Sequence, residues 1–231
     1  MGYGYYGIDM SYIVLVMPAI LFSLWAQTKV NSTFSKYQRV RCYSGYTGAE
    51  IARRILDENG LSDVRVERVS GSLTDHYDPT KRVVRLSDSV YASDSVAAVG
   101  VAAHETGHAV QHATGYGPLG LRNAIIPITN FGSKLSMPLI LLGLLLNSYS
   151  LAMTGIIAFS MVALFQLITL PVEFNASRRA MRTLSNGMLS DRELGGARQV
   201  LTAAALTYVA ALLVSAMQLL RLLLLVNRRR D

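Results

Sequence analysis

Cysteine is almost absent from this sequence, since Cys42 is the only one among 231 residues. A lone cysteine cannot form a disulfide within the chain, and it cannot supply the set of thiolates that structural zinc sites use. Charged residues are also scarce at 16%, whereas hydrophobic residues make up 51%. A metal site in this chain would therefore depend on histidines and carboxylates.

Long stretches of the chain contain no charge at all. Residues 10–28, 135–172 and 199–220 are free of Asp, Glu, Lys and Arg, and a short apolar stretch follows Arg221. A helix needs about 20 apolar residues to cross a bilayer. The stretch 135–172 therefore has room for two short spans that turn at residues 147–149. The sequence predicts a mainly α membrane protein with about four transmembrane helices.

The first uncharged stretch could instead be a cleaved signal peptide. It lacks a basic segment before it and a small-residue cleavage site after it, so a retained span is favoured. Tyr3, Tyr5 and Tyr6 precede the stretch. Tyrosine is common at the membrane–water interface, so we expect residues 1–9 to form an interfacial leader.

The predicted organisation has five parts. They are a leader with the first transmembrane helix (residues 1–28), a small α+β insert (29–134), a transmembrane hairpin (135–172), a juxtamembrane helix (173–198), and a last transmembrane helix with a basic tail (199–231). Pro171 is expected to end the hairpin, and Pro118 and Pro127 are expected to make residues 116–128 partly irregular.

The insert carries its own secondary-structure signals. Thr47 and Glu50 match a capping box, which predicts that a helix begins there. Apolar alternation predicts strands at residues 64–69 and 81–86, whereas 75–79 is expected to be a polar loop. We expect the second of these strands to offer a sheet edge to an extended peptide.

Net charge is +7, from 22 Lys and Arg against 15 Asp and Glu. Basic chains often bind nucleic acid, but the basic residues here gather beside the apolar stretches, where anionic lipid and membrane topology explain them better. More of them lie on the side of residues 29–134 than on the side of the terminal Arg228, Arg229 and Arg230. The insert is therefore expected to face the cytoplasm.

The clearest motif is His104-Glu105-Thr106-Gly107-His108, the H-E-x-x-H pattern. On a helix, His104 and His108 lie on one face and can bind one metal ion, while Glu105 can reach a water beside it. Two histidines on a surface helix would give the same pattern. The flanking residues are small and apolar, however, and buried His and Glu need partners or a metal. We predict a zinc-binding helix over residues 94–114, although Fe(II), Co or Mn would also suit such ligands in part.

Glu173 is the predicted third ligand of this zinc ion. Catalytic zinc usually has three protein ligands and a water. One span before the insert and two after it return the chain to the same membrane side at Glu173. An acidic residue at the edge of an uncharged span is functional by default. The alternative is an interfacial carboxylate paired with Arg178 or Arg179.

Other third ligands are weaker candidates. His76 lies in the expected polar loop, and Asp191 and Glu193 lie in a stretch that reads as solvated. His112 is two helical turns beyond His104, roughly 12 Å along the axis, which is too far to share one ion with it.

Several stretches together resemble the YugP-like bacterial membrane family of neutral zinc metallopeptidases. The resemblance covers nearly the whole chain, and it rests on residues 73–79 (LTDHYDP), 101–108 (VAAHETGH) and 170–179 (LPVEFNASRR). It implies a small zincin-like domain of the gluzincin type, with one Zn²⁺ per chain. It also implies a multi-pass protein of the bacterial plasma membrane.

A more distant similarity is to the Ste24/HtpX-type membrane zinc proteases. Those proteins carry a glutamate ligand in an E-x-x-A-D pattern, which Glu173 and Ala176 match. Ser177 stands where that pattern has Asp, whose carboxylate supports a zinc histidine from behind. A serine hydroxyl carries no charge, so we expect weaker support for the histidine here.

The predicted reaction is peptide-bond hydrolysis by zinc-activated water, with Glu105 as the general base. His76, Arg178 and Arg179 are candidates for stabilising the transition state, although the arginines are also explained by positive-inside anchoring. Expected partners are a peptide or membrane-protein substrate, the lipid bilayer, and another copy or another membrane protein. The alternative function is a non-catalytic, zinc-stabilised membrane scaffold. A channel or transporter is disfavoured, because the spans hold no charge except Arg221.

Overall fold

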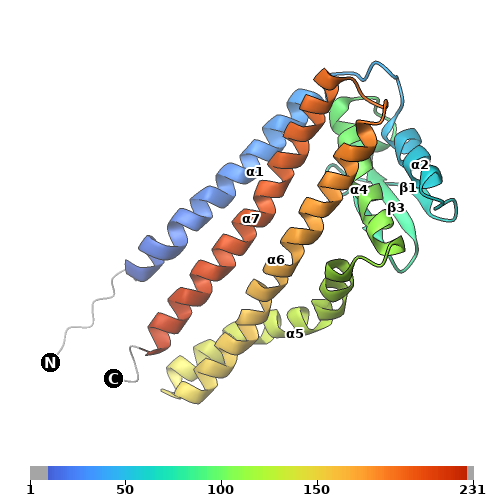
Figure 1. Cartoon of the computed structure of the whole chain (residues 1–231). Helices are drawn as coiled ribbons and strands as arrows, with labels where there is room; N and C mark the ends of the chain where they lie inside the picture. Colours follow the sequence, from blue (N-terminus) through green and yellow to red (C-terminus); the bar gives the residue numbers. More distant parts are fainter. Residues whose placement is uncertain (1–9, 228–231) are drawn as a thin grey trace. The chain divides into compact units, whose positions relative to one another are not determined.

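Four long helices dominate the structure, a computed structural model that describes residues 10–227. A short π-helix, η1 (Tyr12–Val16), leads into α1 (Met17–Tyr37), and the other three long helices are α5 (Gly117–Leu145), α6 (Tyr149–Leu184) and α7 (Asp191–Asn227). All four are long and apolar enough to cross a membrane (Figure 1). The protein is therefore mostly helical, with four candidate spans. The expected leader and the three terminal arginines lie outside the described residues.

The long helices run further than the apolar pattern predicts. Residues 116–128 are not irregular, because α5 begins at Gly117 and continues through Pro127. Pro118 occupies the first turn of α5, where a missing N–H costs nothing. Pro171 does not end the hairpin either, since it lies inside α6, and Glu173 is therefore a helical residue. The turn after Leu145 is where the sequence placed it, with Asn147 at φ +54°.

The chain forms two compact units. The first, here called the apolar unit, comprises the described residues 10–26, 121–169 and 207–227. Ile140, Ala152 and Ile156 belong to its buried cluster. A Cβ on Gly143 would overlap the backbone of Ala152, so glycine allows the two arms of the hairpin to approach closely. Small residues at helix contacts are typical of membrane bundles.

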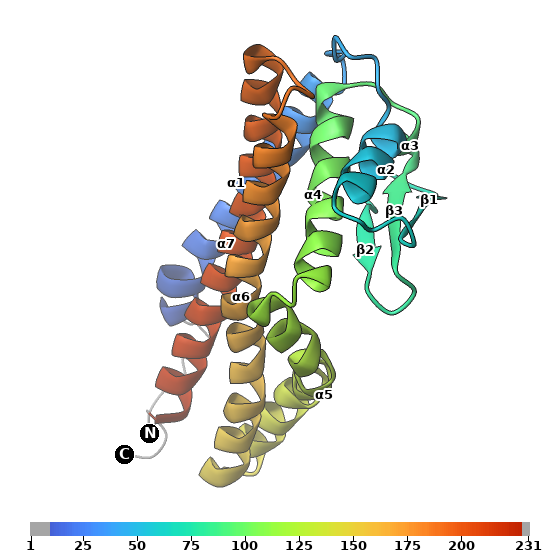
Figure 2. The ribbon, with the colours of Figure 1, turned by 45° about the vertical axis from the view of Figure 1, so that its right-hand side comes forward.

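The second unit, here called the site unit, comprises residues 27–120 and 170–206. It contains α2 (Gly48–Glu58), β1 (Arg65–Val69), β2 (His76–Asp78), β3 (Val83–Ser87), α3 (Asp88–Tyr91) and α4 (Val96–Ala113). The predicted capping box is present, because Thr47 accepts from the Glu50 backbone N–H and Glu50 accepts from that of Thr47. Figure 2 shows α2 and the small sheet lying along α4.

The sheet has the order β1-β3-β2, with β1 parallel and β2 antiparallel to β3. This corrects two expectations. Residues 76–78 are a strand and not part of a loop, because His76 to Asp78 pair with Val83 to Arg85. The strand β3 is central and buried, so it has no free edge; the edges belong to β1 and β2. Pairing with β3 outweighed the polar composition of β2.

Helix α4 is the centre of the site unit. On one side it packs on the sheet and on α2, through a cluster that includes Leu56, Leu86 and Ala98. On another side it packs on the ends of α6 and α7, through a cluster that includes Val99 and Leu184. Its residues are therefore held from several directions, which gives its polar side chains fixed positions.

Candidate metal centre

The two motif histidines lie in the second half of α4. The helix begins at Ser95, whose hydroxyl accepts the backbone N–H of Ala98 at 3.2 Å. It ends before Gly115, which adopts φ +63°. His104 and His108 are one turn apart, and their rings meet edge to face with centroids 4.8 Å apart.

Helix α6 crosses α4 at Gly107, the residue between Thr106 and His108. A Cβ on Gly107 would lie 2.8 Å from the carbonyl oxygen of Ala176, which is too close for any other residue. Glu173 lies three residues before Ala176 and therefore on the same face of α6. The crossing thus brings the Glu173 carboxylate to the two imidazoles.

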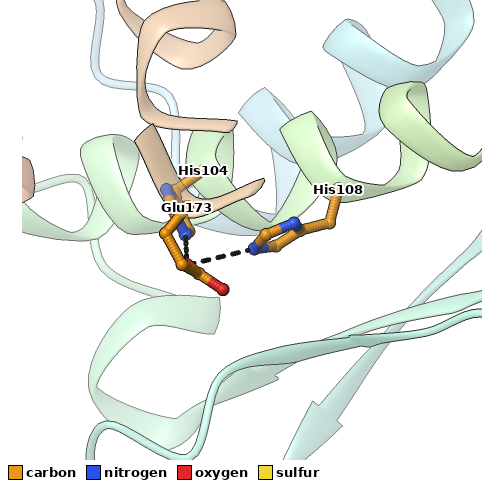
Figure 3. Close-up of side chains that lie close together, drawn as sticks. All are labelled: His104, His108 and Glu173. Atoms are coloured by element: carbon orange, nitrogen blue, oxygen red, sulfur yellow. Dashed lines mark hydrogen bonds and ion pairs between the residues drawn. The ribbon is translucent and has the colours of Figure 1, made fainter. Parts of the chain in front are cut away.

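Three ligand atoms converge at this crossing (Figure 3). One carboxylate oxygen of Glu173, Oε2, lies 3.2 Å from His104 Nε2 and 3.5 Å from His108 Nε2. All three donor atoms lie within 4.8 Å of one another, and Glu173 is only 2% exposed. A tetrahedral zinc ion with bonds of about 2.0–2.2 Å places its ligand atoms roughly 3.3–3.6 Å apart. The donor set and the two distances from the Glu173 oxygen therefore fit a zinc ion.

The outward nitrogens of both rings are occupied. His104 Nδ1 lies 3.1 Å from the Ser177 hydroxyl, and His108 Nδ1 lies 2.9 Å from Gln111 Oε1. An amide oxygen can only accept, so His108 carries its proton on Nδ1. Its Nε2 then presents a lone pair towards Glu173, which is the tautomer a metal ligand needs.

The amide of Gln111 is itself held from behind. Its nitrogen donates to the carbonyl oxygen of Val172 at 2.8 Å and to Asn175 Oδ1 at 3.0 Å. Asn175 Oδ1 also accepts from Arg179 Nε at 2.9 Å. Gln111 is completely buried. This network was not predicted from the sequence, although a glutamine in an apolar helix, three residues after His108, indicates a buried polar group that needs partners.

Charge reinforces the arrangement around His108. Burial alone would lower the pKa of His108, but the hydrogen bond that the protonated His108 ring donates to the Glu173 carboxylate and the negative charges of Glu105 and Glu173 outweigh it and raise the pKa above its ordinary value. Glu105 is 9% exposed. Within residues 10–227 no protein group forms a hydrogen bond or an ion pair with its carboxylate.

The other predicted site residues, His76, Arg178 and Arg179, have different surroundings. The His76 ring contacts the carbonyl oxygen of Thr74 and the Arg85 guanidinium. Arg178 is exposed, and Arg179 contacts Asn175. None of the three forms a hydrogen bond with His104 or His108 among the described residues.

A second polar contact links the sheet to α4. The Tyr77 hydroxyl lies 2.9 Å from His112 Nδ1, one turn beyond His108. The edge strand β2 therefore lies over the C-terminal half of α4. The sequence does not predict this pair, because the polar composition of residues 75–79 favours a loop.

Comparison with known proteins gives the same chemistry. Residues 12–227 match the profile of the family described as "Putative neutral zinc metallopeptidase". This chain belongs to that family. A curated relative, "Putative membrane protease YugP" of Bacillus subtilis (strain 168), is 55% identical over 223 residues, which cover 96% of this chain and 99% of the relative. No solved structure matches the chain significantly.

Membership in the neutral zinc metallopeptidase family confirms the resemblance predicted from the sequence. It supports a protease role and zinc as the metal. The four apolar helices agree with the membrane location in the name of the relative. The family description names neither a substrate nor the residues that carry the reaction.

Proposed function

We propose that this protein is a membrane-embedded zinc endopeptidase whose His104, His108 and Glu173 hold one Zn²⁺ per chain. One observation carries the proposal: two imidazole nitrogens and one carboxylate oxygen, from helices far apart in sequence, converge with the spacing of a zinc coordination shell. When bound there, zinc supplies a Lewis acid for the peptide carbonyl and lowers the pKa of water towards about 7.

Glu105 is the general base in this proposal. It is adjacent to His104, lies close enough to raise the pKa of His108, and is not engaged by another described group. Its carboxylate takes a proton from the attacking water and then passes it to the leaving amine. With Glu173 as the third ligand, the proposed arrangement is gluzincin-like, and we propose the α+β part of the site unit as the zincin-like domain.

Gln111 and Ser177 are positioning residues in this proposal. Gln111 accepts the Nδ1 proton of His108 and so fixes both the tautomer and the plane of the ring. The Ser177 hydroxyl plays the same part behind His104, in place of the carboxylate of the Ste24/HtpX-type pattern. The exposure of Arg178 favours membrane anchoring, and the contact of Arg179 with Asn175 favours positioning, over a direct role of either in the transition state.

We propose that the substrate pairs with β2. This strand pairs with β3 on one side only, and its Tyr77 contacts α4 one turn beyond His108. An extended peptide added to that edge would run past the metal ligands. Because α6 carries Glu173 and is a candidate span, peptides or membrane proteins near the bilayer are the proposed substrate class.

The membrane topology also belongs to the proposal. One candidate span precedes α4, and two lie between α4 and the end of α6, so both ligand-bearing segments would emerge on one side. The positive-inside rule favours the cytoplasmic side of a multi-pass plasma-membrane protein. The five-part division of the chain given above remains our proposal.

A catalytic role is distinguished from a zinc-stabilised scaffold by Glu105→Gln. A scaffold needs the three ligands but not the base. We expect the variant to keep its zinc and to lose about 10²–10⁴-fold in peptidase activity, the range for removing a general base. The measurement pairs metal analysis with cleavage of a peptide library by the full chain in detergent.

The matched control is Glu58→Gln, which makes the same change at an exposed carboxylate paired with Arg54 in the site unit. It should retain both zinc and activity. If Glu105→Gln cleaves as fast as this control, Glu105 is not the base. If the zinc-loaded wild-type chain cleaves nothing, the scaffold function is correct.

A further inference from the structure

A cavity of about 160 Å³ lies beside the α4–α6 crossing, within the site unit, and none of the three proposed ligand residues lines it. It is lined by residues from α2, α4 and α6. The cavity exists because the helices carry small residues there: Ala103 and Gly107 on α4, and Ala180 on α6. None of the three presents a side chain longer than a methyl group, so volume remains between the helices.

The polar lining of this cavity is cationic. Arg179 and Arg182, one turn apart on α6, both contribute to it, together with Asn59 and Thr183. No carboxylate lines the cavity. Across residues 10–227, moreover, neither guanidinium has a carboxylate within ion-pair distance. Two positive charges thus line one cavity without a protein counter-charge among the described residues.

The donors available in the cavity come mainly from the two arginines. Arg179 Nε donates to Asn175 Oδ1, and one terminal nitrogen of Arg179 lies 3.5 Å from the Thr114 hydroxyl. Its other terminal nitrogen remains available, as does the whole guanidinium of Arg182, for which no described partner exists. The Thr183 hydroxyl donates to the carbonyl oxygen of Arg179, so it adds no donor.

We propose that this cavity is a binding site for a phosphate-type oxyanion. Guanidinium groups match the oxygens of phosphate through pairs of parallel N–H donors, and such charge-assisted hydrogen bonds are strong. The half-buried Arg179 would hold the inner side of the anion, and the exposed Arg182 would close the mouth of the cavity. The proposal does not depend on zinc or on the peptidase reaction.

Two sources could supply such an anion. Arg182 lies in the last turn of α6, a candidate membrane span, so the phosphate of a lipid headgroup is one candidate source. Free phosphate from solution has the same chemistry. The two sources differ in that a headgroup arrives only with its lipid, so the experiment supplies each one separately.

Arg182→Gln tests the site, and Arg178→Gln is its matched control. Both arginines are exposed and lie on α6, and both changes remove one positive charge, but only Arg182 lines the cavity. Thermal unfolding of the full chain in neutral detergent is followed at constant ionic strength. Inorganic phosphate is titrated in one arm, and in the other phosphatidylglycerol is compared with diacylglycerol, which has no phosphate. Non-specific salt effects on stability act on all variants alike and are subtracted in this way.

We expect either inorganic phosphate or phosphatidylglycerol to stabilise the wild type and Arg178→Gln against thermal unfolding. The apparent affinity of Arg182→Gln for the same probe should be at least about tenfold weaker. Arg182→Lys keeps the positive charge but loses the paired N–H donors of the guanidinium, so its apparent affinity should lie between those of the wild type and Arg182→Gln. Stabilisation by inorganic phosphate identifies an anion from solution, and stabilisation by phosphatidylglycerol alone identifies a lipid headgroup. If Arg182→Gln and Arg178→Gln respond equally to both probes, the proposal is wrong and the arginines serve only as membrane anchors.

Discussion

The two imidazoles of the candidate metal centre lie one helical turn apart, yet they are held in different ways. The outward nitrogen of His108 meets the buried Gln111 amide, which α6 fixes through Val172 and Asn175. The outward nitrogen of His104 meets a single hydroxyl, that of Ser177. Because an amide held at both ends cannot rotate, His108 has one fixed orientation, whereas a hydroxyl can turn to follow its partner.

This difference indicates a division of labour within one site. His108 belongs to a network that joins α4 to α6, so its position and the helix crossing stabilise each other. His104 is a ligand with a weaker support, and it faces Glu173 at 3.2 Å, the shorter of the two inner contacts. Substitutions can separate a difference in the hydrogen bonds behind the two histidines from a difference in how strongly each histidine binds zinc.

The largest effect is expected from replacing either imidazole. His104→Ala and His108→Ala should each lower zinc affinity by at least about 10³-fold, because each removes one of three protein ligands. Equal losses would show that the two histidines bind zinc equally and differ only in the hydrogen bonds of their outward nitrogens. Competition against a zinc chelator measures both variants. If His104→Ala keeps wild-type affinity, His104 does not bind the metal and the comparison fails.

Removal of the supports should give a smaller and unequal effect. We expect Gln111→Ala to weaken zinc binding about 10–100-fold, the range for lost support of a ligating histidine, and Ser177→Ala to weaken it by less. The full chain of each variant is titrated with the same chelator. Equal losses in the two variants would contradict the asymmetry. Gln111→Met, which fills the same volume without the acceptor, separates lost support from a cavity.

A modest gain is expected from Ser177→Asp. A carboxylate behind His104 would accept its Nδ1 proton with a charge-assisted hydrogen bond, in place of a neutral one. Zinc affinity should rise a few-fold, and the subsequent loss caused by Gln111→Ala should not change. The same titration measures this, with Ser185→Asp on an exposed position as the control. A fall in affinity would show that a negative charge does not fit behind His104.

The sequence was sufficient for the parts of the site that depend on local geometry. His104, Glu105 and His108 follow from the repeat of one helix, whatever that helix packs against. Glu173 required a second argument, from the number of spans, and the structure brings its carboxylate to both imidazoles. For the motif on α4 and for Glu173 alike, a polar residue within an apolar stretch of sequence indicated the site.

The parts that could not be predicted depend on contacts between elements. Gln111 and Asn175 meet only because Gly107 lets α4 approach α6, and no local pattern encodes that crossing. The strand β2 exists because it pairs with β3, although its composition favours a turn. Pro171 lies inside α6, which continues on both sides of it, so this proline does not end the helix as its local preference predicts.

The central claim is that a carboxylate from α6 completes a metal site begun on α4. It is tested most directly by the zinc content of the purified full chain, wild type against Glu173→Ala, with Glu58→Ala as the control. The account predicts one zinc per chain in the wild type and the control, and almost none in Glu173→Ala after dialysis against a weak chelator. A zinc content of one in Glu173→Ala, at unchanged affinity, would contradict it.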